Sequence, residues 1–467
     1  MTRVLVLALA VLIAPAGVAS AQQPSAPRWA AAIDSMMWRE MARTRTPGAQ
    51  IAIVQGGRLV YTQGYGTADV ETGRRVSEHT LFQTGSVAKL FAGMLLAQLA
   101  SNGTLDLQAP ASRYIPEIAG RRVGASTAHE LLTHSAGWVA GGIPFGRSDD
   151  AALDAAHREV GDTMIVPGLR GIYSYSNPSL AMAGYVAERA ARRPFAVLLD
   201  SVLLEPLGMA RTTHRPMLAM TYDFSLGHAP APDGTTPRVV RPMPGNSAEW
   251  GAGFLYTSTA ETARLAIALM DSGMLEGRRV LSPDAIRAVT TGHVSRGGSQ
   301  LLRAGYGVNN DSVGTHRFWQ KGGSVEGYRA LLTMWPSEKL AIAVFTNQLS
   351  DLTYQATALA AHTVARIART PLPTDPPGAG RQPTPAERAE LVGVYRIGRR
   401  TFEIVDSGGR LERRMANAAP ILMTGIDQFI LTAPSGDVIA HHVVRDAAGR
   451  IHYLFNGQTA LLRVTEP

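Results

Sequence analysis

The spacing of apolar side chains predicts helices and strands in blocks along the first 370 residues. Residues 29–44 show helical spacing, and residues 50–65 form two alternating runs around a glycine pair, which is typical of a β-hairpin. Residues 87–101 are apolar on nearly every side, which predicts a buried helix. Because strands, then helices, then strands follow one another, we expect an α+β fold, a sheet covered by helices. The later strands are expected at 303–308, 316–320, 328–335 and 340–346, and a closing helix at 352–369.

The pattern changes after residue 370. Residues 371–385 are rich in proline and glycine, which is typical of a semi-rigid linker. Residues 386–467 contain only short alternating runs separated by glycine-containing turns, which predicts a small antiparallel barrel or sandwich. We therefore expect a large domain at 28–370 and a small all-β domain at 386–467. The short runs are 391–395, 402–405, 429–431, 438–444 and 451–455.

Residues 1–21 have the pattern of a secretory signal peptide. Arg3 precedes an unbroken apolar run at 4–13, and Ala19-Ser20-Ala21 offers a small-residue cleavage site. The run is too short to span a bilayer as a mature helix. We expect a secreted or periplasmic protein without a stable membrane anchor after cleavage. An uncleaved anchor is the alternative.

Composition excludes several classes of protein. The chain of 467 residues has a net charge of +8, yet its basic residues form no block or stripe, so we expect no nucleic-acid partner. It has no cysteine, which excludes disulfides, thiol nucleophiles and zinc–thiolate sites. His129-Glu130 is followed by His134, one residue too far for the zinc-protease motif, so we interpret both histidines as structural. We expect neither a metal nor another cofactor.

Lysine is rare, which draws attention to each occurrence. Only 3 of the 45 basic residues are lysines: Lys89, Lys321 and Lys339. Arginine stays protonated in proteins, whereas a buried lysine can lose its proton. Lys89 follows Ser86 by three positions, so on a helix both side chains share one face. Neutral Lys89 could then activate the Ser86 hydroxyl as a nucleophile. The alternative is a capping serine followed by a surface lysine.

Two further segments carry candidate chemistry. Tyr175-Ser176-Asn177 precedes Pro178, a residue favoured at the start of a helix, so it is expected on a loop at a helix start. Tyr175 could relay a proton, and Asn177 could orient Lys89 or bind a substrate amide. Lys321, Gly323 and Ser324 belong to Lys321-Gly322-Gly323-Ser324 at a strand end, where glycines allow close backbone approach. The backbone N–H groups of Ser86 and Ser324 could form an oxyanion hole. Each segment alone could equally be an ordinary turn.

Together the three segments resemble one family. Ser-x-x-Lys at 86–89, Tyr-x-Asn at 175–177 and Lys-x-Gly at 321–323, in this order, are similar to the serine β-lactamase and penicillin-binding-protein superfamily. The tyrosine resembles its branch of class C β-lactamases, D-Ala-D-Ala carboxypeptidases and esterases. The small C-terminal segment, from Val392-Gly393-Val394-Tyr395 on, resembles the lipocalin-like domain of some family peptidases. The resemblance implies a transpeptidase-like fold with a helical subdomain.

The resemblance also implies roles for these residues. Ser86 would be the acylated nucleophile, Lys89 and Tyr175 would share acid and base work, and Asn177 and Lys321 would position the substrate. Gly322 departs from the family, since β-lactamases usually carry a hydroxyl residue there, which argues against efficient β-lactam turnover. The expected substrate is a small molecule, peptide or ester whose amide or ester bond is hydrolysed. The alternative is a catalytically weak cell-wall or ligand-binding module on the same fold. The oligomeric state stays open.

Overall fold

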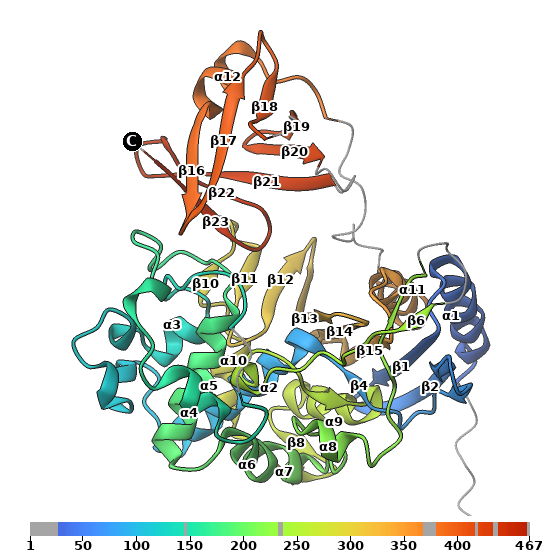
Figure 1. The fold of residues 1–467 in the computed structure, drawn as a ribbon. Helices are drawn as coiled ribbons and strands as arrows, with labels where there is room; N and C mark the ends of the chain where they lie inside the picture. The colour runs from blue at the N-terminus through green and yellow to red at the C-terminus, as the bar shows by residue number, and fades with distance from the viewer. Residues whose placement is uncertain are drawn as a thin grey trace, which may run out of the picture.

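The computed structural model describes residues 27–143, 147–231, 237–367, 380–415, 419–432 and 438–464. The expected signal peptide at 1–21 and most of the expected linker at 371–385 lie outside these ranges. Figure 1 shows two parts, a large α+β body and a β-barrel formed by the C-terminal residues. None of the described helices is long and apolar enough to cross a membrane.

The body is organised around a nine-stranded antiparallel sheet. Its central strands β14, β15 and β1 are almost completely buried, because they are covered on both faces. The sheet order is β10 (Val294–Ser295), β11 (Leu302–Ala304), β12 (Asn309–Val313), β13 (His316–Val325), β14 (Tyr328–Trp335), β15 (Leu340–Thr346), β1 (Gly48–Gln55), β2 (Arg58–Asp69) and β3 (Arg74–Arg75).

Alternation along β1 divides the core between the two faces. Ile51 and Ile53 pack with helices α1 (Ala30–Thr44) and α11 (Leu352–Ala365). Ala52 and Val54 belong to the larger core on the opposite face, which includes α2 (Ala88–Ser101) and α9 (Thr259–Met270). The period-two pattern of the sequence therefore becomes a sheet between two helical layers.

Helix α2 is the centre of the helical part. Eleven of its 14 residues are buried, as its apolar sequence predicts. It contacts α5, α6 and α10. The surrounding helices are α3 (Ala128–Leu132), α4 (Ala152–His157), α5 (Asn177–Ala191), α6 (Phe195–Leu199), α7 (Glu205–Leu207), α8 (Pro216–Ala219) and α10 (Pro283–Thr290). Three two-stranded sheets join the loops: β4 (Phe82–Gln83) with β7 (Tyr256–Thr257), β5 (His228–Ala229) with β6 (Arg238–Val239), and β8 (Met274–Leu275) with β9 (Arg278–Arg279).

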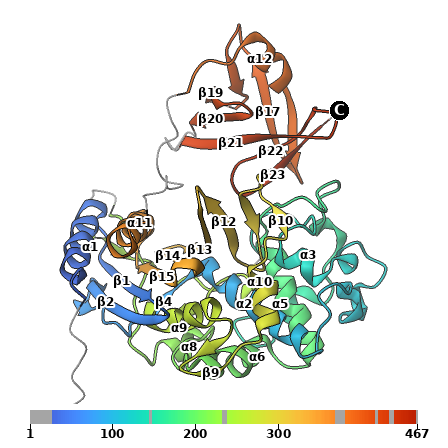
Figure 2. The same cartoon turned by 180° about the vertical axis from the view of Figure 1, so that it is seen from behind.

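The C-terminal part is a closed barrel of eight antiparallel strands. Short helix α12 (Pro385–Leu391) precedes it and begins with a capping box formed by Thr384 and Glu387. Figures 1 and 2 both show the barrel beside the end of the sheet formed by β10, β11 and β12. The strands are β16 (Gly393–Ile397), β17 (Arg400–Asp406), β18 (Leu411–Arg413), β19 (Ala419–Gly425), β20 (Gln428–Thr432), β21 (Val438–Arg445), β22 (Ile451–Phe455) and β23 (Ala460–Arg463).

Most expected elements are present, and two expected strands are wrong in their ends. The strand expected at 316–320 continues as β13 to Val325, so residues 321–324 lie within a strand and not at its end. Helix α1, the β1–β2 hairpin and α2 confirm the periodicity, and the α+β class is confirmed. The strand expected at 303–308 ends at Ala304, because Gly305 N–H donates to the carbonyl of Val308 at 2.8 Å and closes a turn before β12. Gly307 in that turn has a φ of 69°, which favours glycine. The choice between barrel and sandwich is settled by closure of the barrel.

Gly93 on α2 gives a test of how tightly the body packs. A Cβ atom there would lie 2.2 Å from the carbonyl oxygen of Tyr306. Alanine gains about 1 kcal/mol over glycine in a helix, but overpacking costs about 1–3 kcal/mol. We expect Gly93→Ala to lower the unfolding temperature measured by circular dichroism. Gly161→Ala is the control, since its Cβ would have no neighbour within 4 Å. A Gly93→Ala protein as stable as the wild type would contradict the close contact.

Candidate active site

Ser86 lies at the junction between the sheet and α2. It belongs to the 3₁₀ turn η1 (Gly85–Val87), which leads directly into α2. Gly85 has a φ of 50°, and a Cβ atom there would lie 2.7 Å from the carbonyl oxygen of Ser324. A Cβ atom on Gly323 would lie 2.0 Å from the carbonyl oxygen of Thr84. Both glycines therefore allow η1 to contact β13, which brings the backbones of Ser86 and Ser324 together.

Lys89 is buried one turn after Ser86. Its Nζ lies 3.1 Å from Ser86 Oγ, 2.7 Å from Asn177 Oδ1 and 2.5 Å from the carbonyl oxygen of Ala252. Burial lowers the pKa of Lys89 to about 7, because water no longer solvates the ammonium, while the charge of Glu249 opposes the shift. A large fraction of Lys89 is therefore neutral near pH 7. Because the side chain is buried, the surface-lysine alternative is wrong.

Tyr175 also contacts Ser86. Its hydroxyl oxygen lies 2.6 Å from Ser86 Oγ. The Nζ atoms of Lys89 and Lys321 lie 4.9 Å and 5.3 Å from the centroid of its ring. The ring of His134 packs against it with centroids 4.5 Å apart. Tyr175 is therefore held between two lysine side chains and an imidazole, with its hydroxyl at hydrogen-bond distance from Ser86 Oγ.

Asn177 is the first residue of α5, as expected for a motif at a helix start. Ser176 caps the helix by accepting a hydrogen bond from Ser179 N–H at 3.1 Å. The backbone N–H of Ser176 donates to His134 Nδ1 at 3.1 Å. These bonds fix the Tyr175–Asn177 segment, so both side chains reach the pair formed by Ser86 and Lys89.

Lys321 lies on β13 and faces the same site. It is buried, and burial lowers its pKa to about 8. Its ammonium has no hydrogen-bond partner among the residues that the structure describes. A cation without a hydrogen-bond partner at this place is available to an anionic or developing negative charge.

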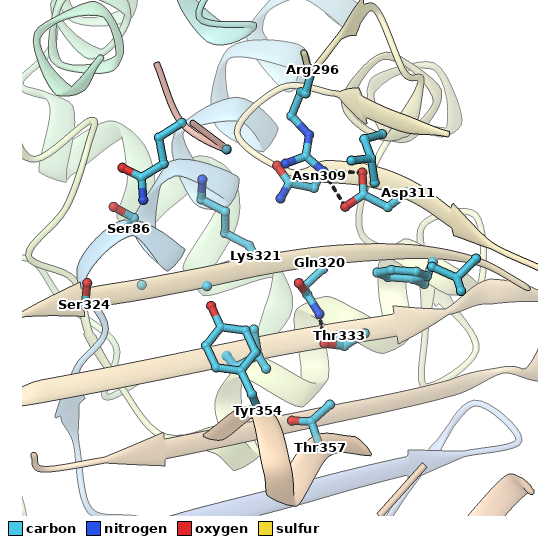
Figure 3. Close-up of a pocket in the computed structure, with 18 of the residues that line it drawn as sticks. Ser86, Arg296, Asn309, Asp311, Gln320, Lys321, Ser324, Thr333, Tyr354 and Thr357 are labelled. Atoms are coloured by element: carbon cyan, nitrogen blue, oxygen red, sulfur yellow. Dashed lines mark hydrogen bonds and ion pairs between the residues drawn. The ribbon is translucent and has the colours of Figure 1, made fainter. Parts of the chain in front are cut away.

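Ser86 opens into a cavity of about 660 Å³. Figure 3 shows Ser86, Lys321 and Ser324 along β13, with Tyr354 of α11 directed toward that strand. A Cβ atom on Gly322 would lie 3.1 Å from the Tyr354 hydroxyl, so the space of the missing side chain is partly filled from α11. Besides these, the cavity is lined by Asn177, Gly323, Phe318, Leu331, Trp335, Ala361, Gly457 and Gln458, among others.

The structure adds Glu249 and Gln458, which sequence reasoning missed, and places His134, interpreted from the sequence as structural, next to Tyr175. Glu249 is buried, and its charge raises the pKa of Lys89. His134 supports the Tyr175 ring, and burial holds the pKa of its imidazole well below its usual range, so it is neutral. Gln458 enters from the C-terminal barrel. All three are distant in sequence from the motifs, and none has a local pattern that marks it.

The histidines of the rejected zinc motif have separate partners. His129 Nδ1 pairs with the hydroxyl of Tyr306 at 2.8 Å, whereas His134 accepts from Ser176. Within the described ranges, no group of three His, Cys, Asp or Glu residues is placed to hold a metal ion. Both histidines stabilise the fold around the site.

Comparison with known proteins agrees with this geometry. The profile of the Beta-lactamase family matches residues 33–366. A beta-lactamase of Pseudomonas fluorescens is 30% identical over 200 residues, which cover 41% of this chain and 54% of the relative. Esterase EstB of Burkholderia gladioli is 33% identical over 199 residues, 38% of this chain and 50% of the relative. The chain thus spans about half the length of these curated relatives.

A solved structure extends the likeness of the fold to the barrel. The crystal structure of SurE superposes with a TM-score of 0.76 at 24% identity and covers 93% of this chain and 98% of its own. The family profile covers most of the body, including the segments that carry Ser86, Lys89, Tyr175 and Lys321. The chain therefore belongs to the Beta-lactamase family.

Proposed function

We propose that the protein hydrolyses amide or ester bonds through an acyl-enzyme on Ser86. The observation that carries this proposal is the position of Lys89, whose Nζ is 3.1 Å from Ser86 Oγ and has two other oxygen acceptors. A neutral amine has two N–H donors and one lone pair. When the donors bind Asn177 and Ala252, the lone pair is directed at Ser86 and can accept its proton.

Acylation follows from this arrangement. Ser86 Oγ transfers its proton to Lys89 and bonds to the substrate carbonyl carbon, whose oxygen becomes negative. The backbone N–H groups of Ser86 and Ser324, with the Lys321 charge nearby, stabilise that oxygen. When the tetrahedral intermediate collapses, the leaving group takes a proton from Lys89 through the Tyr175 hydroxyl, 2.6 Å from Ser86 Oγ. The product is an ester between Ser86 and the acyl group.

Deacylation uses the same groups in reverse. A water molecule passes one proton through the Tyr175 hydroxyl to Lys89 and attacks the acyl carbon with its oxygen. Ser86 Oγ leaves and regains a proton. Asn177 keeps Lys89 oriented during both steps, because its Oδ1 accepts from Nζ at 2.7 Å. The two half-reactions predict ping-pong kinetics.

The substrate proposed is an ester or a peptide-like amide in preference to a β-lactam. Gly322 offers no hydroxyl to a substrate carboxylate, and Tyr354 fills part of that space. The esterase name of one relative agrees with this preference. We also propose that the hydrolase is exported, on the signal-peptide pattern of residues 1–21.

Substitution at Ser86 and Lys89 tests the proposed chemistry. We expect Ser86→Ala to lower turnover by about 10⁴-fold or more and to abolish labelling by a fluorophosphonate. Lys89→Arg should be nearly as damaging, because the charge survives but proton transfer does not. Intact-mass measurement and ester hydrolysis provide the readouts, with Lys339→Arg as the exposed lysine control. Folded wild-type protein without an adduct would favour a binding module instead.

The pH dependence tests the base. Because Lys89 must be neutral, kcat/KM should rise as pH increases through the Lys89 pKa of about 7. It should fall again as Lys321 loses its charge above its pKa of about 8. Lys321→Arg retains the charge, so its alkaline limb should move to higher pH. A profile that is flat from about pH 6 to about pH 9 would argue against Lys89 as the base.

A parallel assay tests the substrate preference. The three substrates are a short-chain nitrophenyl ester, a D-alanine anilide and a chromogenic cephalosporin. We expect the ester or the anilide to have the highest kcat/KM and the cephalosporin the lowest, because Gly322 lacks the carboxylate contact. Cephalosporin hydrolysis as fast as that of the ester would reverse the preference.

A further inference from the structure

The barrel is packed against the loop that carries Tyr175. Val166, Leu169 and Tyr173 of the body belong to the same buried apolar cluster as the barrel residues. The rings of Tyr173 and Phe455 lie with centroids 6.0 Å apart. A Cβ atom on Gly297 would lie 2.3 Å from the Phe455 ring, so the contact leaves no space there. The barrel thus packs closely against the body next to the site.

One turn of the barrel reaches the active site itself. It consists of residues 456–459 between β22 and β23. Asn456 Oδ1 accepts hydrogen bonds from the backbone N–H of Gln458 at 3.1 Å and of Thr459 at 2.8 Å, which fixes the turn. The backbone N–H of Tyr175 donates to the Gln458 carbonyl at 2.9 Å. A backbone hydrogen bond therefore joins this turn to Tyr175, the residue whose hydroxyl contacts Ser86.

The side chain of Gln458 is available to a ligand. It is exposed, it lines the cavity that contains Ser86, and it makes no hydrogen bond to the described residues. Figure 3 shows a red-brown segment of barrel chain next to the labelled Ser86 and Lys321. A carboxamide offers two N–H donors and one acceptor oxygen.

Two other hydrogen-bonding groups face the same cavity. Asn177 Oδ1 is occupied by Lys89, so its Nδ2 donors remain. The β12–β13 ladder ends at Gln320, which leaves the outer backbone edge of Lys321–Ser324 without a strand partner in the described chain. A strand edge and two carboxamides together match the alternating donors and acceptors of a peptide group.

We propose that Gln458 is a substrate-binding residue that selects acyl groups containing a secondary amide close to the scissile carbonyl. The barrel then forms one wall of the cavity at Ser86, and β13 forms another. This inference rests on the proposed acyl-Ser86 mechanism and assigns its substrate class. A peptide-like acyl group gains a hydrogen bond from Gln458 that a plain alkanoyl group cannot make.

The test compares two nitrophenyl esters in the full-length protein. The N-acetylglycyl ester contains the amide, and the pentanoyl ester has the same chain length and leaving group without it. Gln458→Leu keeps the approximate size but removes the hydrogen bond. We expect the ratio of kcat/KM, N-acetylglycyl over pentanoyl, to fall about three- to tenfold, the effect of one neutral hydrogen bond. Gln428→Leu, exposed on β20 away from the cavity, should leave the ratio unchanged.

The outcomes separate this inference from the mechanism. An unchanged ratio in Gln458→Leu overturns the substrate role of Gln458, and so does an equal loss for both esters, which would mean that the turn only supports the site. Fluorophosphonate labelling of Ser86 is measured on the same samples. Wild-type protein that neither labels nor hydrolyses either ester overturns the proposed function itself.

Discussion

The burial of one amine dictates the arrangement of the active site. Lys89 lies on the buried helix α2, where an ammonium ion loses its hydration. Hydrogen bonds from Nζ to oxygens of three separate segments, at Ser86, Asn177 and Ala252, replace the lost water. Each oxygen must be delivered at hydrogen-bond distance, so η1, the start of α5 and the loop after Trp250 are fixed relative to one another. The same desolvation that is unfavourable for stability lowers the pKa of the Lys89 amine to about 7, as the proposed base role requires.

The site could be predicted from the sequence where its geometry is local. Ser86 and Lys89 share a helical face by spacing alone, and Pro178 correctly indicated the helix start that positions Asn177. Tyr175 became interpretable only together with the other motifs, because a lone tyrosine on a loop has no chemical signature. Glu249, His134 and Gln458 could not be predicted, since each meets the site only through tertiary packing.

The fold shows the same limit. Long periodic segments such as α1, β14 and β15 were predicted almost to their ends. The three-residue strand β18 was missed because so few residues define no period. The glycine pair at 322–323 was interpreted as room for substrate. The structure gives another reason for Gly323, whose missing side chain makes room for Thr84 and η1. Gly322 instead faces Tyr354, so the two neighbouring glycines make room for different parts of the chain.

The apolar cluster shared by the body and the barrel has a consequence for how the protein loses its structure. Cooperative units are defined by shared burial, and Tyr173, Leu169 and Val166 lie in one core with Phe455 and Leu461. Opening of the barrel therefore exposes the base of the Tyr175 loop and releases its backbone bond, while the nine-stranded sheet retains its own core. Because the same cluster also includes Ala304 of β11, loss of the barrel would uncover apolar side chains of the body both in the segment before Tyr175 and on the sheet.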